Sequence, residues 1–208
     1  GCGLLLRIQG RQEMGKLFYI IGKSSTGKDT IFQSLLENRK LNLEPLVLYT
    51  TRPMRVGETP GVQYHFTDED GLSKLEAENR VIELRAYHTV HGIWKYFTAD
   101  TEATDLEQHD YIGVGVLESF RALRNYYGAD KVVPLYIEVE DGERLQRALD
   151  RERAQEEPRY AELCRRFLAD SEDFSEEKIQ EAGIQKRFYN RDLKECIEEI
   201  NSYIQASL

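Results

Sequence analysis

Hydrophobic and polar residues alternate along the chain in blocks that predict an α/β fold. Short apolar runs, typical of buried strands, are followed by stretches in which apolar residues recur every three or four positions. Strands are predicted at 17–21, 46–49, 81–87, 110–116, 131–139 and 184–189, and an aromatic strand or loop at 92–98. Repeated alternation of strand and helix predicts a central parallel sheet flanked by helices.

The predicted helices differ in character along the chain. They run from Gly27 to Asn38 and over residues 68–79, 117–127 and 191–204. Residues 141–175 are much more charged, and the two helices predicted there, 143–155 and 159–174, are separated by a polar hinge. We expect this charged pair to form a helical lid.

Composition and charge narrow the class of protein. The chain has 208 residues, 40% hydrophobic and 31% charged, which is ordinary for one globular domain. Its apolar runs are all far shorter than the roughly 20 residues that a membrane-spanning helix needs. The formal net charge of -9 argues against general nucleic-acid binding, which requires an uncompensated basic surface. We therefore expect neither a membrane nor a nucleic-acid partner, and protein partners stay open.

The cysteines and the N-terminus carry little functional information. Cys2, Cys164 and Cys196 are far apart and odd in number, so they predict neither a disulfide framework nor a zinc site. A reduced, cytoplasmic protein is the favoured interpretation. Residues 1–15 precede the first strand and include Met14, which has the position of a natural start. We interpret them as an N-terminal extension or a remnant of cloning, without a function.

Residues 17–32 have the pattern of a phosphate-binding loop. An apolar strand leads into Gly22, four further residues, Gly27 and Lys28, and a helix follows. Backbone N–H groups of such a loop surround a polyphosphate, its lysine reaches the outer oxygens, and the helix N-terminus adds a positive dipole. The loop residues expected to bind the polyphosphate are Gly22, Ser24, Ser25, Thr26, Gly27, Lys28, Asp29 and Thr30.

Asp29 departs from this pattern, because the residue after the lysine is normally Ser or Thr. A carboxylate is a good oxygen ligand for Mg2+, so Asp29 is the candidate metal ligand. Its charge also repels phosphate when no cation lies between them. We therefore expect a strong dependence on the metal.

A second stretch, residues 50–66, reads TTRPMRVGETPGVQYHF and resembles the monophosphate-binding segment of guanylate kinases. With the phosphate loop and the later elements, the resemblance extends over nearly all of residues 16–208 and is weaker in the last third. It implies a P-loop kinase fold with a small mixed β subdomain. The implied divisions are a core at 16–49 and 100–140, a monophosphate-binding subdomain at 50–99, a lid at 141–175, and a closing strand and helix at 176–208.

By this resemblance, the second stretch holds the phosphate of the acceptor nucleotide. Planar guanidinium groups bind a doubly charged phosphate in a bidentate manner, which suits Arg52 and Arg55. Glu58 is expected to orient the two arginines. Tyr64 and Tyr96 are expected to donate their hydroxyl groups to the same phosphate, and for each tyrosine alone core packing is the alternative.

The base of the acceptor is read, by the same resemblance, by Glu83 and Thr98. Guanylate kinases carry a further Asp-x-Asp sequence in the next strand, where residues 113–115 of this chain are Gly-Val-Gly. One base-reading carboxylate and another near the metal are therefore missing. The segment between Glu83 and Tyr96 is also longer than in the family, with Arg85, His88 and His91 inserted or displaced. A site that lacks a hydrogen-bond partner discriminates poorly or reads a different edge of the base.

The lid and the end of the chain complete the implied ATP site. Arg151 or Arg153, together with Arg166, is expected to reach the ATP phosphates, although solvated helix faces are the default for charged residues of this kind. Asn190, in a sequence similar to the adenine-contacting segment of the family, is expected to bind ATP. A helix cap or turn is the alternative for this residue.

The resemblance implies phosphorylation of a nucleoside monophosphate by ATP with Mg2+, with GMP or dGMP as the leading acceptors. The residues expected to act on the transferring phosphoryl group are Lys28, Arg52, Arg151 and Arg166. Two alternatives remain: a catalytically silent guanylate-kinase-like binding module, and a P-loop kinase that acts on another phosphorylated small molecule.

Overall fold

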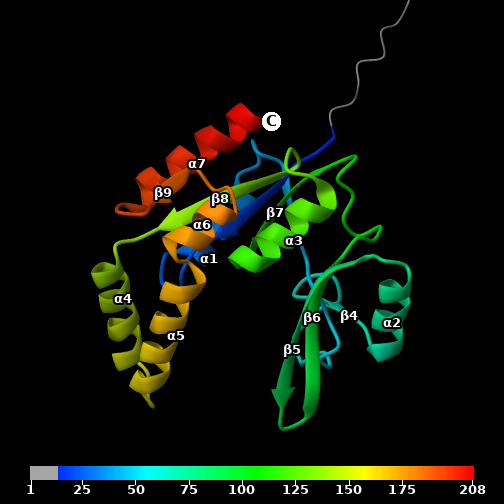
Figure 1. The fold of residues 1–208 in the computed structure, drawn as a ribbon, viewed down its shortest axis with the longest axis horizontal. Coiled ribbons are helices and arrows are strands. Elements are labelled where there is room, and N and C mark those ends of the chain that lie inside the picture. The colour runs from blue at the N-terminus through cyan, green and yellow to red at the C-terminus, as the bar shows by residue number, and fades with distance from the viewer. Residues whose placement is uncertain (1–13) are drawn as a thin grey trace, which may run out of the picture.

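A computed structural model describes residues 14–208 and shows an α/β core with two projections (Figure 1). The core is a five-stranded sheet in which every neighbouring pair is parallel, as the sequence predicts. Its strands, in spatial order, are β2 (Leu43–Pro45), β7 (Asp110–Gly115), β1 (Leu17–Ile21), β8 (Val132–Glu138) and β9 (Arg187–Tyr189). Most of the extension predicted at residues 1–15 lies outside the described residues.

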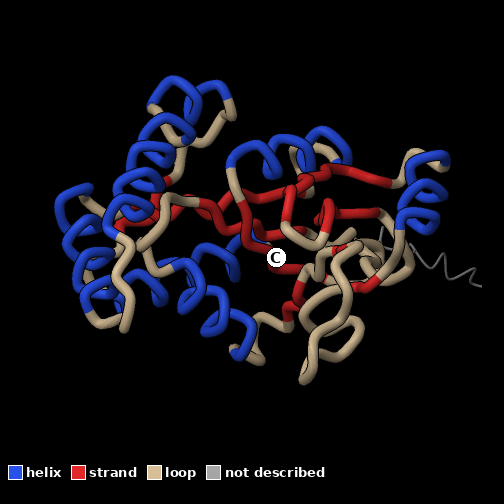
Figure 2. Tube along the Cα trace, turned by 90° about the horizontal axis from the view of Figure 1, so that it is seen from below, coloured by secondary structure: helices blue, strands red, loops and turns tan. Residues whose placement is uncertain are grey.

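Strand β1 is the centre of the core and is buried on both faces. Phe18 and Ile20 pack on one face with α1 (Lys28–Glu37) and α7 (Leu193–Ser207). Tyr19 and its neighbours on the other face pack against α3 (Leu117–Tyr127) and α6 (Glu176–Glu181). Figure 2 shows helices on both sides of the strands. Full burial explains why β1 is apolar throughout rather than alternating.

The first projection is a small mixed sheet. Its strands, in spatial order, are β4 (His65–Phe66), β3 (Tyr49–Thr50), β6 (Gly92–Ala99) and β5 (Val81–Thr89). Helix α2 (Glu69–Ala77) covers it through Leu72, which packs against Phe97 and Ala99. The hairpin of β5 and β6 extends away from the core (Figure 1). The mixed subdomain that the resemblance implies is thus present in the structure.

The second projection is the pair of helices α4 (Asp141–Arg153) and α5 (Tyr160–Asp173), which lies on the other side of the core from the hairpin (Figure 1). Both helices agree with the predicted charged pair to within two residues at each end. Among residues 14–208, every helix is too short or too polar to cross a lipid bilayer.

Two local predictions are wrong. Of the strand predicted at 46–49, only Tyr49 lies in a strand, β3. Over residues 46–48 the chain crosses from one sheet to the other: Leu46 N–H donates to Ile112 of the core, and Leu48 C=O accepts from His65 of the small sheet. The polar residues after 175 also form a helix, α6, which was not predicted. The Ser175 side chain caps it by accepting from Lys178 N–H.

The glycines of β7 have a packing role. Tyr19 of β1 lies beside Gly113 in the parallel register, and its hydroxyl group is 2.7 Å from the Ser119 hydroxyl of α3. A Cβ at Gly115 would lie 1.8 Å from the Tyr19 hydroxyl, and one at Gly113 would lie 3.0 Å from the Tyr19 ring. A buried tyrosine on the neighbouring strand therefore blocks a side chain at position 115 and crowds one at position 113.

Gly115→Ala is expected to lower the free energy of unfolding by about 1–3 kcal/mol, the usual cost of overpacking a core. Gly113→Ala, whose added carbon has more room, serves as the milder comparison. Tyr19→Leu removes the nearer of two obstructing hydroxyl groups, the other being that of Ser119 at 2.6 Å from the added carbon. The double variant Tyr19→Leu/Gly115→Ala should therefore lose less stability than the sum of its single changes. Urea unfolding measures all four proteins. Strict additivity would contradict the packing explanation.

Candidate active site

The phosphate loop connects β1 to α1 and has the backbone geometry that its glycines predict. Gly27 adopts a φ of 85°, in the left-handed region, and immediately precedes the first turn of α1. Residues 24–30 line a cavity of about 430 Å³, to which α4 contributes Arg147 and Arg151. The cavity thus combines backbone donors, a helix N-terminus and two lid arginines, which suits a polyphosphate.

Lys28 lies across the loop rather than pointing into solvent. Its ammonium group donates to the carbonyl oxygens of Gly22, at 2.7 Å, and Lys23, at 2.8 Å. Burial lowers the pKa of Lys28, and the carboxylates of Asp170 and Asp29 oppose this shift. An ammonium group has three protons. Within residues 14–208, these two bonds leave one of them for a phosphate oxygen.

Asn190 supports the loop from the end of β9. Its side-chain amide donates to the Thr26 carbonyl at 2.9 Å, and a Cβ at Gly27 would lie 2.7 Å from the same amide nitrogen. The residue is 3% exposed. The structure therefore places Asn190 beside the loop, and the contact with adenine stays a prediction.

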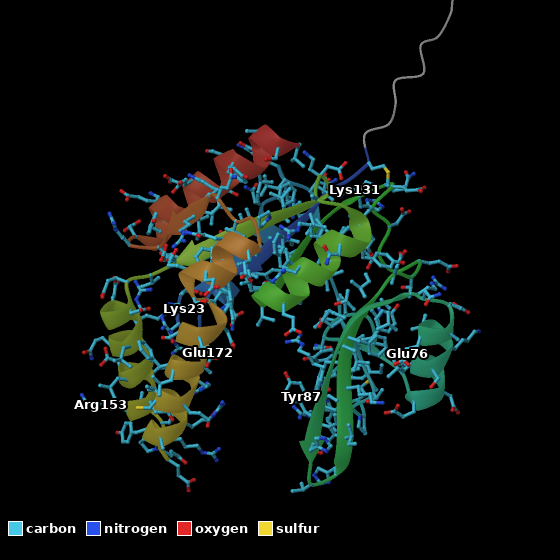
Figure 3. All side chains as sticks on the ribbon, viewed as in Figure 1. Lys23, Glu76, Tyr87, Lys131, Arg153 and Glu172 are labelled. Carbon is cyan, nitrogen blue, oxygen red and sulfur yellow. The ribbon has the colours of Figure 1, made fainter. Side chains whose placement is uncertain are left out.

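The two alternatives for the lid arginine next to the loop differ in position. Arg151 donates to the Ser25 hydroxyl at 2.8 Å and so lies at the mouth of the phosphate cavity. Figure 3 shows Arg153 on the outer side of α4, away from the hairpin. Arg166 of α5 is half-exposed and lies 4.0 Å from Glu152 and 3.9 Å from Glu162. Arg151 is thus the one of the three that contacts the loop.

A buried charge network that sequence reasoning missed ties the lid helices to the loop. Arg144 of α4 is 1% exposed, lies 4.4 Å from the centre of the Phe167 ring, and donates to the Ser24 carbonyl at 3.3 Å. It also pairs with Asp170 of α5 at 3.4 Å. Asp170 in turn accepts from the backbone N–H of Ser24 at 2.9 Å and from its hydroxyl group. The positions of α4, α5 and the loop are therefore coupled.

Arg52 and Glu58 form a preorganised pair in the small subdomain. Arg52 is 3% exposed and donates from both terminal nitrogens to the two Glu58 oxygens, each at 2.8 Å. The backbone N–H of Arg55 donates to Glu58 at 2.7 Å. These contacts lower the pKa of Glu58 to about 2, with the Arg52 side chain as the main cause. Glu58 thus holds the Arg52 guanidinium in place, and the role of the pair toward a phosphate stays a prediction.

The two tyrosines lie beside this pair. The rings of Tyr64 and Tyr96 meet edge to face with their centres 5.5 Å apart, and the Arg52 guanidinium is 5.3 Å from the centre of the Tyr64 ring. Both tyrosines line a cavity of about 370 Å³ together with Arg85 and Tyr87. Figure 3 shows Tyr87 on the side of the hairpin that faces α4 and α5. The Arg55 side chain is exposed and does not share the burial of Arg52.

Glu83 and Thr98 are cross-strand neighbours on β5 and β6, and Thr98 donates to Glu83 at 3.3 Å. Burial raises the pKa of Glu83, and the Arg85 charge and the Thr98 hydroxyl oppose the shift. The structure therefore brings together the two residues expected to read the base. Arg85, which the resemblance did not assign, lies beside them with its Nε 3.6 Å from Glu83.

Metal ligands are sparse in this site. Residues 14–208 contain no group of three or more His, Cys, Asp or Glu placed to hold a metal ion. Asp29 and Thr30 are exposed in the first turn of α1 and line the phosphate cavity. Mg2+ commonly takes one or two protein ligands and fills its other positions with water and phosphate oxygens. The two residues fit such an ion.

Comparison with known proteins agrees with this arrangement. The family model described as guanylate kinase matches residues 14–207. The guanylate kinase of Porphyromonas gingivalis is 27% identical over 195 residues, which cover 92% of this chain and 97% of that protein. The crystal structure of guanylate kinase from Anaplasma phagocytophilum shares the fold with a TM-score of 0.57 at 19% identity, covering 93% of this chain and 86% of that one.

Other relatives match over shorter stretches. The guanylate kinase of Neisseria gonorrhoeae is 37% identical over 91 residues, and that of Zymomonas mobilis is 44% identical over 70 residues. The matched stretches cover 44% and 33% of this chain, and span only 42% and 32% of those two relatives. The match over residues 14–207 includes the phosphate loop, the small subdomain and the lid helices. The chain therefore belongs to the guanylate kinase family.

Proposed function

We propose that this protein transfers the terminal phosphoryl group of ATP to a nucleoside monophosphate, with GMP or dGMP as the acceptor. The observation that carries the proposal is the presence in one chain of a phosphate loop with Lys28 and of the buried Arg52–Glu58 pair. A loop of this kind holds the donor, and an oriented guanidinium beside two tyrosines holds a second phosphate. Family membership supports the same reaction.

The mechanism needs positioning and charge neutralisation rather than a covalent intermediate. Lys28 and Arg151 lie on the donor side, and Arg52 on the acceptor side, so that cations surround the phosphoryl group in transfer. The acceptor phosphate is already an oxyanion, and a general base is not required. Closure of α4 and α5 excludes water, which otherwise competes as acceptor.

Mg2+ is the proposed cofactor. It neutralises charge on the donor phosphates when bound, and Asp29, with Thr30 beside it, is the proposed protein ligand. Asp29 also contributes to the field at Lys28, since its negative charge favours the protonated ammonium form.

Asp29→Ser is expected to preserve turnover and to change the Mg2+ requirement. The serine hydroxyl restores the usual loop residue but removes a negative charge, so the Mg2+ concentration that gives half-maximal activity should rise severalfold. Mg2+ titrations at fixed ATP and GMP measure this concentration. Thr67→Ser, a half-buried position between β4 and α2 that does not line the phosphate cavity, is the control. An Mg2+ titration that is unchanged in Asp29→Ser would exclude Asp29 as a direct ligand.

The test of the reaction is ADP release from ATP and Mg2+ with GMP, dGMP, AMP, CMP and UMP supplied in turn. Turnover with GMP or dGMP supports the proposal. Absence of turnover with every monophosphate, combined with thermal protection by phosphate-containing ligands, would leave a silent binding module. The intact loop lysine and cavity argue against that outcome.

A second candidate is a P-loop kinase with a different phosphorylated small acceptor. The observation that favours it is the absence of carboxylates at positions 113 and 115, where Tyr19 crowds any side chain and where guanylate kinases carry them. Turnover of another monophosphate in the same panel, with GMP inactive, would support it. Protein partners stay open, and a cytoplasmic location stays a prediction.

A further inference from the structure

The wall of the acceptor site that faces the base has a different charge from the one the resemblance implies. By the resemblance, guanylate kinases carry two carboxylates there, one on each of the strands that correspond to β5 and β7. The structure retains Glu83 on β5, but β7 offers only glycine at positions 113 and 115. Tyr19 of β1 fills the space that a carboxylate side chain at these positions would need.

Arg85 adds a positive charge to this wall. It lies two residues from Glu83 on the same face of β5, and its cross-strand partner is Tyr96. Its Nε is 3.6 Å from the nearer Glu83 oxygen, and this nitrogen is buried without a hydrogen-bond partner in the part of the chain that the structure describes.

Arg85 lines the same cavity as Tyr64 and Tyr96, and its contact with Glu83 favours the base end of the site over the phosphate end. The phosphate end already has Arg52, which is fixed by Glu58 and lies beside Tyr64. The Arg85 guanidinium is instead next to Glu83, whose other neighbour is Thr98. A ligand that occupies this end meets one carboxylate and one guanidinium side by side, together with hydroxyl groups.

We propose that Arg85 is a specificity-determining residue that binds the O6 and N7 atoms of a guanine base, while the adjacent Glu83 accepts from its N1–H and N2–H groups. This rests on the proposed function, because it assigns the acceptor of the same site. Arginine pairs with O6 and N7 of guanine in a bidentate manner, and this is the commonest base-specific contact of arginine.

The neighbouring positions of Glu83 and Arg85 match the neighbouring edges of guanine. Its donor edge and its acceptor edge meet at O6, so a carboxylate and a guanidinium in contact can bind both. Adenine presents an acceptor where Glu83 requires a donor and an amino group beside N7, and pyrimidines have no N7. The exchange of a carboxylate for an arginine therefore preserves guanine as the acceptor base but changes the edge that is read.

The experiment compares GMP with 7-deaza-GMP, which has carbon in place of N7 and is otherwise alike. Dissociation constants are measured by calorimetry for the wild type, Arg85→Met and His88→Ala, and kcat/KM is measured with ATP and Mg2+. His88 is exposed on the opposite face of the same strand and serves as the matched control. Methionine keeps the apolar stem of Arg85 and removes its donors.

The wild type and His88→Ala are expected to bind GMP about tenfold more tightly than 7-deaza-GMP, and Arg85→Met to bind the two equally, with GMP weakened about ten- to a hundredfold. A merely structural role of Arg85 would weaken both ligands alike and keep their ratio, which would overturn the proposal. Equal binding of both ligands by the wild type would overturn it as well.

Binding and turnover separate this proposal from the proposed function. A wild-type protein that prefers GMP over 7-deaza-GMP but transfers no phosphoryl group would refute the kinase and support the role of Arg85. Turnover of GMP by the wild type, with the same ratio of GMP to 7-deaza-GMP binding in Arg85→Met as in the wild type, would support the kinase and refute the role of Arg85. If Arg85→Met does not show a cooperative thermal transition, Arg85→Gln replaces it, and retention of the ratio in that variant overturns the proposal equally.

Discussion

Lys28→Met is expected to lower kcat about a thousandfold, the largest effect of any single change in the donor site. The ammonium group of Lys28 lies on the loop carbonyls of Gly22 and Lys23, within the cavity that residues 24–30 form. Methionine has a similar length but no charge, so it fills the same space without stabilising the transferring phosphate. Steady-state ADP release measures kcat, and calorimetry with GMP checks that the acceptor site is intact.

Lys23→Met is the matched control for this change. Lys23 is in the same loop, but its ammonium group is directed to Asp141 of α4, at 3.2 Å. We expect its kcat to stay within a few-fold of the wild type, as is usual when one partner of a partly exposed ion pair is removed. A Lys28→Met protein that keeps more than a tenth of its kcat would contradict the assignment of Lys28.

Arg52→Met is expected to lower kcat/KM for the acceptor about a thousandfold, and Arg55→Met to lower it less. Arg52 is buried and fixed by two bonds to Glu58, whereas the Arg55 side chain is exposed. An already oriented cation loses little conformational freedom when the phosphate binds, so more of its interaction energy is available to stabilise the transition state. Initial rates with GMP varied at saturating ATP measure both variants.

Glu58→Gln separates orientation from direct binding in this pair. The amide keeps the shape of Glu58 but removes the charge that holds the Arg52 guanidinium, so kcat/KM should fall while some activity remains. The double variant Arg52→Met/Glu58→Gln should be as inactive as Arg52→Met and more resistant to heat than that single variant, because no carboxylate is left unpaired. An Arg55→Met protein more impaired than Arg52→Met would reverse the assignment of the two arginines.

The parts of the site that could be predicted from the sequence are those that a short segment builds by itself. The phosphate loop is one short segment in which Lys28 contacts Gly22, six positions before it, and Arg52 and Glu58 are likewise six positions apart, so the spacing within each segment indicates its contacts. The main strands and helices could be predicted for a similar reason, because burial against the core imposes the periods of the apolar residues.

The parts that could not be predicted depend on the register between distant segments. Arg144 and Asp170 are 26 positions apart on two charged helices, and only the packing of α4 against α5 brings them to the same loop residue. Tyr19 and Ser119 are 100 positions apart, and the contact needs the parallel pairing of β1 with β7 and the position of α3. In the sequence alone, Gly113 and Gly115 were a loss of carboxylates, and the tyrosine that explains them gave no signal.

The close approach of Tyr19 to Gly115 sets the order in which mutations could alter the wall of the acceptor site that faces the base. A carboxylate introduced at position 115 first meets a buried ring and fails at the level of folding. A smaller residue introduced at position 19 first leaves a cavity, which a core tolerates at a cost of about 2–4 kcal/mol. The nearest obstacle to a side chain at position 115 is then gone, and the Ser119 hydroxyl, 2.6 Å from an added Cβ, is the one that remains. Replacement of Tyr19 must therefore come before a carboxylate is introduced at position 115. Sequences with an aspartate at 115 should accordingly carry a small residue at 19.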